Sequence, residues 1–93
     1  MSWTLVTTVS LDRRTRKLLA RHPDLRPPRL ADTLEKLHTD PFEPGLRLHP
    51  LTGKLQGMQA VSLTYSYRVT LTLQITEHEI LLLDIGSHDE VYG

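Results

Sequence analysis

Four side chains of types that support chemistry stand out in this 93-residue sequence: two histidines, one arginine and one tyrosine. His88 follows an apolar run and Gly86, so we expect it just past the end of a strand. His49 lies in a segment rich in proline and glycine, which predicts a loop. Histidine titrates near physiological pH and therefore serves as a general acid or base. With Arg68 and Tyr92, the two histidines could form an RNA-cleaving site that uses no metal.

RNA cleavage by side chains alone requires three functions. A base removes the proton of the 2′-hydroxyl, an acid protonates the leaving 5′-oxygen, and positive charge stabilises the phosphate as it gains electron density. We assign His88 as the acid and Arg68 as the phosphate clamp, because a guanidinium presents forked donors. His49 is either the base or a second phosphate contact. Tyr92 offers a ring on which a splayed base could stack.

Each assignment has a structural alternative. A loop histidine such as His49 is more often a solvated residue than a catalyst. Arg68 could pair with Asp84 across adjacent strands, as a surface ion pair of about 0–1 kcal/mol. Tyr92 could pack against the sheet. His22, His38 and His78 fall at predicted helix ends or in a turn, where a structural role is favoured.

Acidic residues flank the predicted acid. We include Asp84 and Asp89, with Tyr92, among the substrate-binding candidates. Together with Glu90 and His88 they suggest a metal site, but their spacing matches no pattern of metal ligands. We therefore expect neither a metal nor another cofactor.

Length and composition predict a single domain spanning residues 1–93. The absence of cysteine excludes disulfides, zinc–thiolate sites and thiol nucleophiles, and it fits a cytoplasmic protein. The N-terminal residues lack the pattern of a signal peptide, and no apolar run approaches the roughly 18 residues of a membrane span. We expect a soluble protein of the cytoplasm.

Charge is unevenly distributed, although the formal net charge is zero. Residues 1–54 carry ten Lys or Arg and six Asp or Glu, a net charge of +4, whereas residues 55–93 carry one Arg and five acidic residues, a net charge of −4. An RNA-binding domain usually shows a clear positive excess. Any contact with RNA must therefore come from a local basic patch.

Two helices are expected after a first strand at residues 3–9, which alternates β-branched and apolar residues. Ser10 is predicted to cap a helix over residues 11–21, with an apolar stripe on one face and an arginine-rich run on the other. His22-Pro23 ends this helix. Pro27-Pro28 suits the first turn of a second helix that reaches about His38.

The remainder of the chain predicts a long loop and three strands. Residues 40–57 hold three prolines and three glycines, so we expect a loop there. Strands are predicted from 58 to about 65, at 67–75 and at 80–85, joined by short turns. The expected fold is α+β, with the order β-α-α-β-β-β and a mainly antiparallel four-stranded sheet packed on a helical hairpin. One sheet face packs on the helices, and the other carries Arg68, Thr70 and Thr72.

Several features of the chain, in this order, resemble the RelE/ParE toxin superfamily, most of all its YafQ-type branch. They are the helical hairpin, His49-Pro50-Leu51-x-Gly53, Gly57, Tyr67-Arg68-Val69 and Gly86-x-His88-Asp89-x-Val91-Tyr92. The resemblance runs over roughly the whole chain. It implies a RelE-like fold, and it matches His49 to a loop histidine, His88 to the histidine after the last strand and Tyr92 to a C-terminal aromatic position. Ala60, Ser62 and Ser66 stand where YafQ-type toxins place further acidic and histidine residues.

The resemblance also implies a function. It suggests the toxin of a type II toxin–antitoxin system, a metal-independent endoribonuclease that cleaves mRNA in the ribosomal A site and is neutralised by a cognate antitoxin. Its partners would be the antitoxin, the ribosome and mRNA. The run Arg13–Arg21 is then either a solvated helix face or a contact for ribosomal RNA or an acidic antitoxin segment. The alternative is a non-cleaving module, either a gyrase inhibitor of the ParE kind or a degenerate toxin that only binds its antitoxin.

Overall fold

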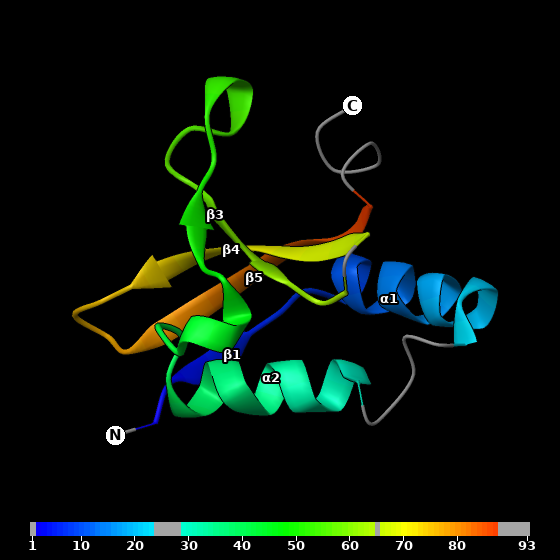
Figure 1. Ribbon diagram of the computed structural model, residues 1–93, viewed down its shortest axis with the longest axis horizontal. Helices are drawn as coiled ribbons and strands as arrows, with labels where there is room; N and C mark the ends of the chain where they lie inside the picture. The colour runs from blue at the N-terminus through cyan, green and yellow to red at the C-terminus, as the bar shows by residue number, and fades with distance from the viewer. Residues whose placement is uncertain (1, 24–28, 65, 88–93) are drawn as a thin grey trace.

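A computed structural model describes residues 2–23, 29–64 and 66–87 of the chain (Figure 1). The elements are β1 (Thr4–Val6), α1 (Val9–Arg21), α2 (Arg29–Thr39), η2 (Pro44–Leu46), β2 (His49–Pro50), η3 (Gly53–Leu55), β3 (Gln59–Ser62), β4 (Tyr67–Gln74) and β5 (Glu79–Ser87). The predicted α+β class and element order are confirmed. Residues 40–57 are more regular than the predicted loop, because they form two short 3-10 helices and β2.

The sheet has the strand order β1-β5-β4-β3-β2. β1 runs parallel to β5, and the other neighbours are antiparallel. The mainly antiparallel sheet is thus confirmed, with a fifth strand because β2 joins the edge beside β3. Pro50 is compatible with this position, since a proline at a sheet edge leaves no internal ladder donor missing.

The N-terminus of α1 differs from the prediction. The helix begins at Val9 and its N-cap is Thr8, whose side chain accepts a hydrogen bond from the Leu11 amide at 3.0 Å. Ser10 therefore lies inside the helix, and its predicted capping role was wrong. The predicted end is confirmed, because the His22 amide donates the closing bond to the Leu18 carbonyl at 2.9 Å.

β5 is longer than predicted and contains an irregularity. The strand was expected to open at Gly86, but it continues to Ser87, with Gly86 opposite Arg68. Asp84 lies opposite Thr70 whereas Leu82 lies opposite the next residue, so Leu83 is an extra residue in β5. Leu83 is 41% exposed, as expected for a bulge residue.

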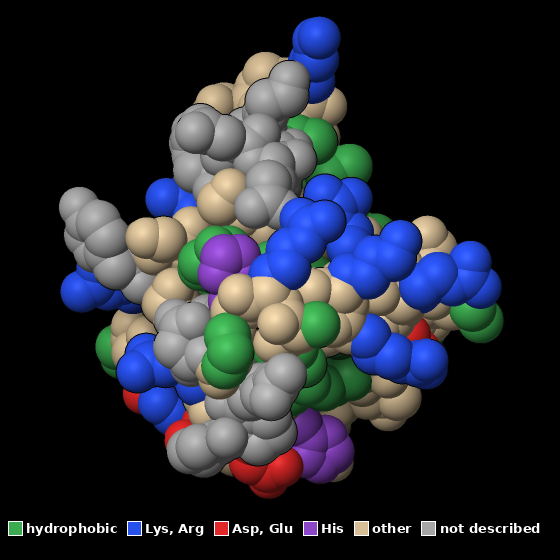
Figure 2. All heavy atoms as spheres, turned by 90° about the vertical axis from the view of Figure 1, so that its right-hand side faces the viewer, with side chains coloured by type: hydrophobic (Ala, Val, Ile, Leu, Met, Phe, Trp, Pro, Cys, Tyr) green, Lys and Arg blue, Asp and Glu red, His purple; other side chains and the backbone are tan. Residues whose placement is uncertain are grey.

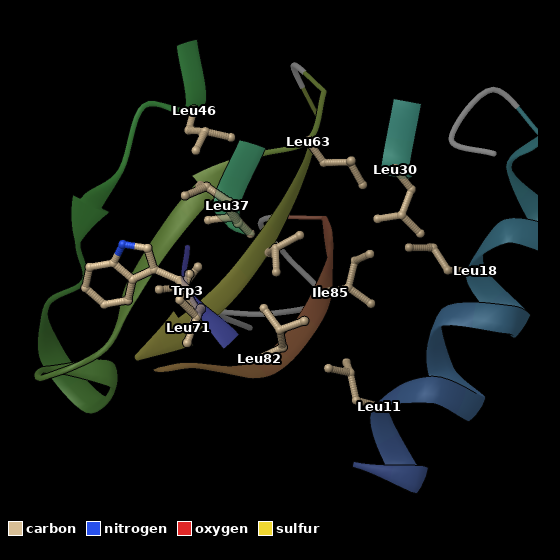
Figure 3. Close-up of a cluster of buried hydrophobic side chains, with 13 residues drawn as sticks. Trp3, Leu11, Leu18, Leu30, Leu37, Leu46, Leu63, Leu71, Leu82 and Ile85 are labelled. Carbon is tan, nitrogen blue, oxygen red and sulfur yellow. The ribbon is translucent and has the colours of Figure 1, made fainter. Parts of the chain in front are cut away.

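The core lies between the sheet and both helices. Leucines of α1 and α2 pack with alternate apolar residues of β3, β4 and β5, and Trp3 contributes beside them (Figure 3). The largest members that are fully buried are Leu37, Leu46, Leu71, Ile80 and Val61. This cluster covers one face of the sheet. No helix in the described part of the chain has the length and apolar character to cross a membrane.

Candidate functional site

His49 and Arg68, two of the predicted catalytic residues, line one hollow of about 420 Å³. His49 lies on β2, and its cross-strand partner Ala60 is in turn paired with Thr70. Side chains alternate along a strand, so Arg68, two residues before Thr70, is on the same face of the sheet. The other lining residues come mainly from the segment after β2: Pro50, Leu51, Thr52, Lys54 and Leu55. Sheet pairing therefore brings together residues that are 19 positions apart in the sequence.

The ring of His49 is oriented by the backbone. Its Nδ1 lies 2.8 Å from the carbonyl oxygen of Arg47. A carbonyl oxygen only accepts hydrogen bonds, so Nδ1 carries the hydrogen and the neutral ring presents Nε2 as an acceptor. An acceptor nitrogen on a partly buried ring at the wall of a hollow has the properties that a general base requires.

Lys54 is a cation that the sequence reasoning did not single out. It lies in η3, on a loop closed by a hydrogen bond from the Leu51 amide to the Met58 carbonyl at 2.9 Å. Gly53 begins η3 with a φ of +66°, a left-handed conformation that favours glycine. The only sequence signal was its place next to the His49-Pro50-Leu51-x-Gly53 pattern, and an isolated loop lysine is usually solvated.

Arg68 also lines a second hollow of about 480 Å³, with Arg47, Ser62 and Thr64. The described residues that line the two hollows include three cations and no carboxylate. Arg47 and Lys54 form no salt bridge with any residue in the described ranges. The described lining of the two hollows is therefore basic, in a protein whose net charge is zero.

Asp84 lies in a different place. Its Oδ1 is 3.2 Å from Nε of Arg14 on α1 and accepts the Ile85 amide at 2.8 Å. The expected alternative, in which Arg68 pairs with Asp84, is not seen: among the described residues, the ion pair of Asp84 is with Arg14. Asp84 lines an apolar hollow of about 200 Å³ with leucines from both helices. The structure does not bring it to the hollow of His49.

Three of the predicted site residues, His88, Asp89 and Tyr92, lie outside the described residues. Their roles stay predictions. Within the part of the chain that the structure describes, no group of three His, Cys, Asp or Glu side chains is arranged to hold a metal ion.

The other histidines make contacts of a structural kind, as predicted. Nε2 of His22 is 2.9 Å from the Tyr67 hydroxyl, and Nδ1 of His38 is 2.7 Å from the Trp3 carbonyl. The ring of His78 lies 4.9 Å from the Trp3 ring, centroid to centroid. These contacts tie helix ends and a turn to β4 and to the residue before β1.

The basic face of α1 is exposed, as both expectations for it require. Arg13, Arg14, Arg16, Lys17 and Arg21 are all exposed. Figure 2, which views the molecule from the side of α1, shows lysine and arginine side chains gathered on this face. Three of them, Arg14, Lys17 and Arg21, line a small hollow of about 120 Å³ with Leu18 and Ile85.

Comparison with known proteins places the fold. No family model matches the sequence, and no curated protein matches it. Among solved structures, YafQ from E. coli has a TM-score of 0.78 at 15% identity, over 98% of this chain and 99% of YafQ. A metal-bound toxin from Helicobacter pylori has a TM-score of 0.74 at 25% identity, over 98% and 99%. The E. coli DinJ–YafQ toxin–antitoxin complex matches with a TM-score of 0.78 at 17% identity, over the full length of both chains. The chain has the RelE-like fold of YafQ, which confirms the fold that the sequence resemblance implied.

Proposed function

We propose that this protein is the toxin of a type II toxin–antitoxin system and an endoribonuclease that cleaves mRNA in the ribosomal A site. The observation that carries the proposal is the hollow in which the acceptor nitrogen of an oriented histidine, His49, shares a wall with two cations, Lys54 and Arg68. The fold supports it, since YafQ has been solved in a toxin–antitoxin complex. The same hollow suits a phosphate flanked by a ribose hydroxyl.

In the proposed reaction, Nε2 of His49 takes the proton of the 2′-hydroxyl, and the resulting oxygen attacks the phosphorus. The bond from phosphorus to the 5′-oxygen breaks, which leaves a 2′,3′-cyclic phosphate and a 5′-hydroxyl end. His88 donates the proton to the leaving oxygen, as its place in the family pattern suggests. Arg68 and Lys54 stabilise the negative charge that the phosphate oxygens gain. Tyr92 stacks on the neighbouring base, and Asp89 contacts the substrate beside it.

The proposed antitoxin is a partner with an acidic segment. The exposed cations of α1 form a surface that such a segment would match by charge, and they are also available to ribosomal RNA.

His49→Asn is the sharpest single test of this chemistry. The asparagine amide can still donate to the Arg47 carbonyl, whereas the acceptor nitrogen that takes the proton is removed. We expect cleavage to fall by about 100-fold or more, the usual contribution of a general base. The measurement is primer extension on a reporter mRNA after brief induction, with His88→Ala as a second variant.

His78→Asn serves as the matched control. It also replaces a histidine by asparagine, on a turn that lines neither hollow, and its φ of +53° is one that asparagine tolerates. We expect this variant to cut translated mRNA like the wild type. Undiminished cleavage by a folded His49→Asn protein would remove His49 from the mechanism. No cleavage by the wild type would overturn the ribonuclease proposal.

The non-cleaving alternative is favoured by one observation. An active YafQ-type site is expected to have acidic and histidine groups at three positions that are here Ala60, Ser62 and Ser66. The described lining of the two hollows also includes no carboxylate. A toxin from Agrobacterium tumefaciens described as YoeB/ParE also shares the fold, with a TM-score of 0.71. Loss of DNA supercoiling on expression, with mRNA intact, would select a gyrase inhibitor.

A further inference from the structure

The second hollow, beyond Arg68, has no part in the cleavage step. Its described lining is Arg47, Ser62, Thr64 and Arg68, all of which can donate hydrogen bonds. Because Arg68 lines both hollows, the two hollows are neighbours. The hollow at His49 has the imidazole acceptor nitrogen, whereas the described lining of this one holds two guanidinium groups and two hydroxyls. Two cations with two hydroxyl donors suit an anion that is bound and not transformed.

Thr64 is held in a state that favours donation to such an anion. Its Oγ1 accepts the amides of Ser66 at 3.3 Å and Tyr67 at 3.2 Å. These bonds occupy the oxygen lone pairs, so the hydroxyl hydrogen remains to be donated. Ser62 is the cross-strand partner of Arg68, which sets its hydroxyl on the same face of the sheet as the guanidinium.

Arg47 links the two hollows through its backbone. Its φ of 55° and ψ of 45° are left-handed, a conformation that costs a residue with a Cβ free energy. In this conformation the carbonyl accepts the hydrogen bond from Nδ1 of His49, while the side chain lines the second hollow. One residue therefore orients the histidine of the first hollow and supplies a cation to the second.

We infer that single-stranded RNA crosses Arg68 and occupies both hollows, with Arg47, Ser62 and Thr64 binding the phosphate next to the one that is cleaved. This inference rests on the proposed function and extends it, because it defines the substrate as a chain with at least two consecutive phosphates. Arg47 is a positioning residue here. Its guanidinium contacts the neighbouring phosphate, and its carbonyl holds the base.

Arg47→Gly separates these two roles. Glycine adopts a φ of 55° without strain, so the carbonyl stays in place and only the guanidinium is lost. The probes are two short RNAs with 2′-O-methyl groups, which block attack by the 2′-oxygen: a dinucleotide with one phosphate and a trinucleotide with two. Affinities are measured by NMR titration of the protein, which detects weak binding.

We expect Arg47→Gly to weaken binding of the trinucleotide about tenfold, as for loss of a charged hydrogen bond, and to leave the dinucleotide unaffected. Arg68→Gln weakens both, because Arg68 lines both hollows. Backbone amides of Ser62 and Thr64 shift with the trinucleotide only, and those of Lys54 and Leu55 shift with both probes. Lys36→Gln, an exposed cation on α2, is the charge-matched control and changes neither affinity.

Three results would overturn the inference: equal affinity of Arg47→Gly and wild type for the trinucleotide, an equal loss for both probes, or no binding of either probe by the wild type. These results are independent of cleavage, which is measured on translated mRNA. If Arg47→Gly loses affinity for the trinucleotide alone and the wild type cuts no mRNA, the inference of two phosphate sites holds and the ribonuclease proposal is overturned. If the wild type cuts mRNA but Arg47→Gly binds both probes as the wild type does, the ribonuclease proposal holds and the inference of two phosphate sites is overturned.

Discussion

Backbone groups close in sequence form hydrogen bonds with three polar side chains of this protein and set which of their atoms remain available. His49 donates from Nδ1 to a carbonyl two residues earlier, and Asp84 accepts the amide of the next residue. Thr64 accepts two amides from the turn that follows it. Each bond leaves one polar atom available for a partner: Nε2 of the histidine, a carboxylate oxygen and a hydroxyl hydrogen.

The ion pair of Arg14 with Asp84 illustrates how little a surface contact contributes at this scale. The two side chains are 48% and 27% exposed. We expect Arg14→Ala to lower the free energy of unfolding by less than about 1 kcal/mol, because water and salt screen the pair. The difference from wild type then shrinks as sodium chloride rises from 0.05 to about 1 M.

Urea denaturation at both salt concentrations is the measurement, and Arg13→Ala is the control. Arg13 is a neighbouring exposed arginine on the same helix, without a salt bridge to any described residue. A loss above roughly 2 kcal/mol for Arg14→Ala alone would mean that the pair is part of a buried network.

At the scale of elements, capping and pairing decide where helices and strands begin and end. α1 starts where Thr8 can accept the amide of Leu11 from an extended backbone, and Ser10 two residues later cannot do so from inside the helix. β5 continues past Gly86 because β4 offers partners as far as Tyr67. Local sequence preferences place such boundaries only to within a few residues.

Replacing the cap tests this directly. Thr8→Ala removes the acceptor for the Leu11 amide, so we expect the free energy of unfolding to fall by about 1 kcal/mol. Ser10→Ala is the matched control, and it is expected to be neutral or slightly stabilising, because alanine is the better helix former inside the helix. Thermal and urea unfolding of the two variants provide the comparison. The opposite ranking would restore Ser10 as the cap.

At the scale of the whole molecule, one apolar cluster joins helices and sheet, and the basic hollows lie at the opposite face. Leu37 of α2 has no exposed surface and packs against this cluster, whereas Leu83 in the β5 bulge is 41% exposed. The face with the core is thus responsible for stability, and the opposite face carries the basic hollows.

We expect Leu37→Ala to lower the free energy of unfolding by about 2–5 kcal/mol, the cost of removing buried methyl groups and leaving a cavity. Leu83→Ala makes the same chemical change at an exposed position, and its expected cost is below about 1 kcal/mol. Equal losses in urea denaturation would contradict the assignment of Leu37 to the centre of the core. A chain this small has little stability to spare, so Leu37→Ala should also fold incompletely at 37 °C.

The sequence by itself determined the elements and the chemical types of the site. Apolar periodicity depends on neighbours a few residues apart, so it predicted both helices and the strands β1, β3, β4 and β5 in their order, but it missed β2 in the expected loop. Residue type and placement along the chain identified His49 and Arg68 as candidates. The family pattern then supplied the RelE-like fold that structural comparison confirms.

Only the tertiary structure decided which of these residues meet. The hollow at His49 depends on the pairing of β2, β3 and β4, and the ion pair of Asp84 with Arg14 depends on the packing of α1 beside β5. The roles of Arg47 and Lys54 depend on left-handed backbone at Arg47 and Gly53. Pairing register and turn geometry are settled by packing between distant segments, and short-range sequence patterns do not contain that information.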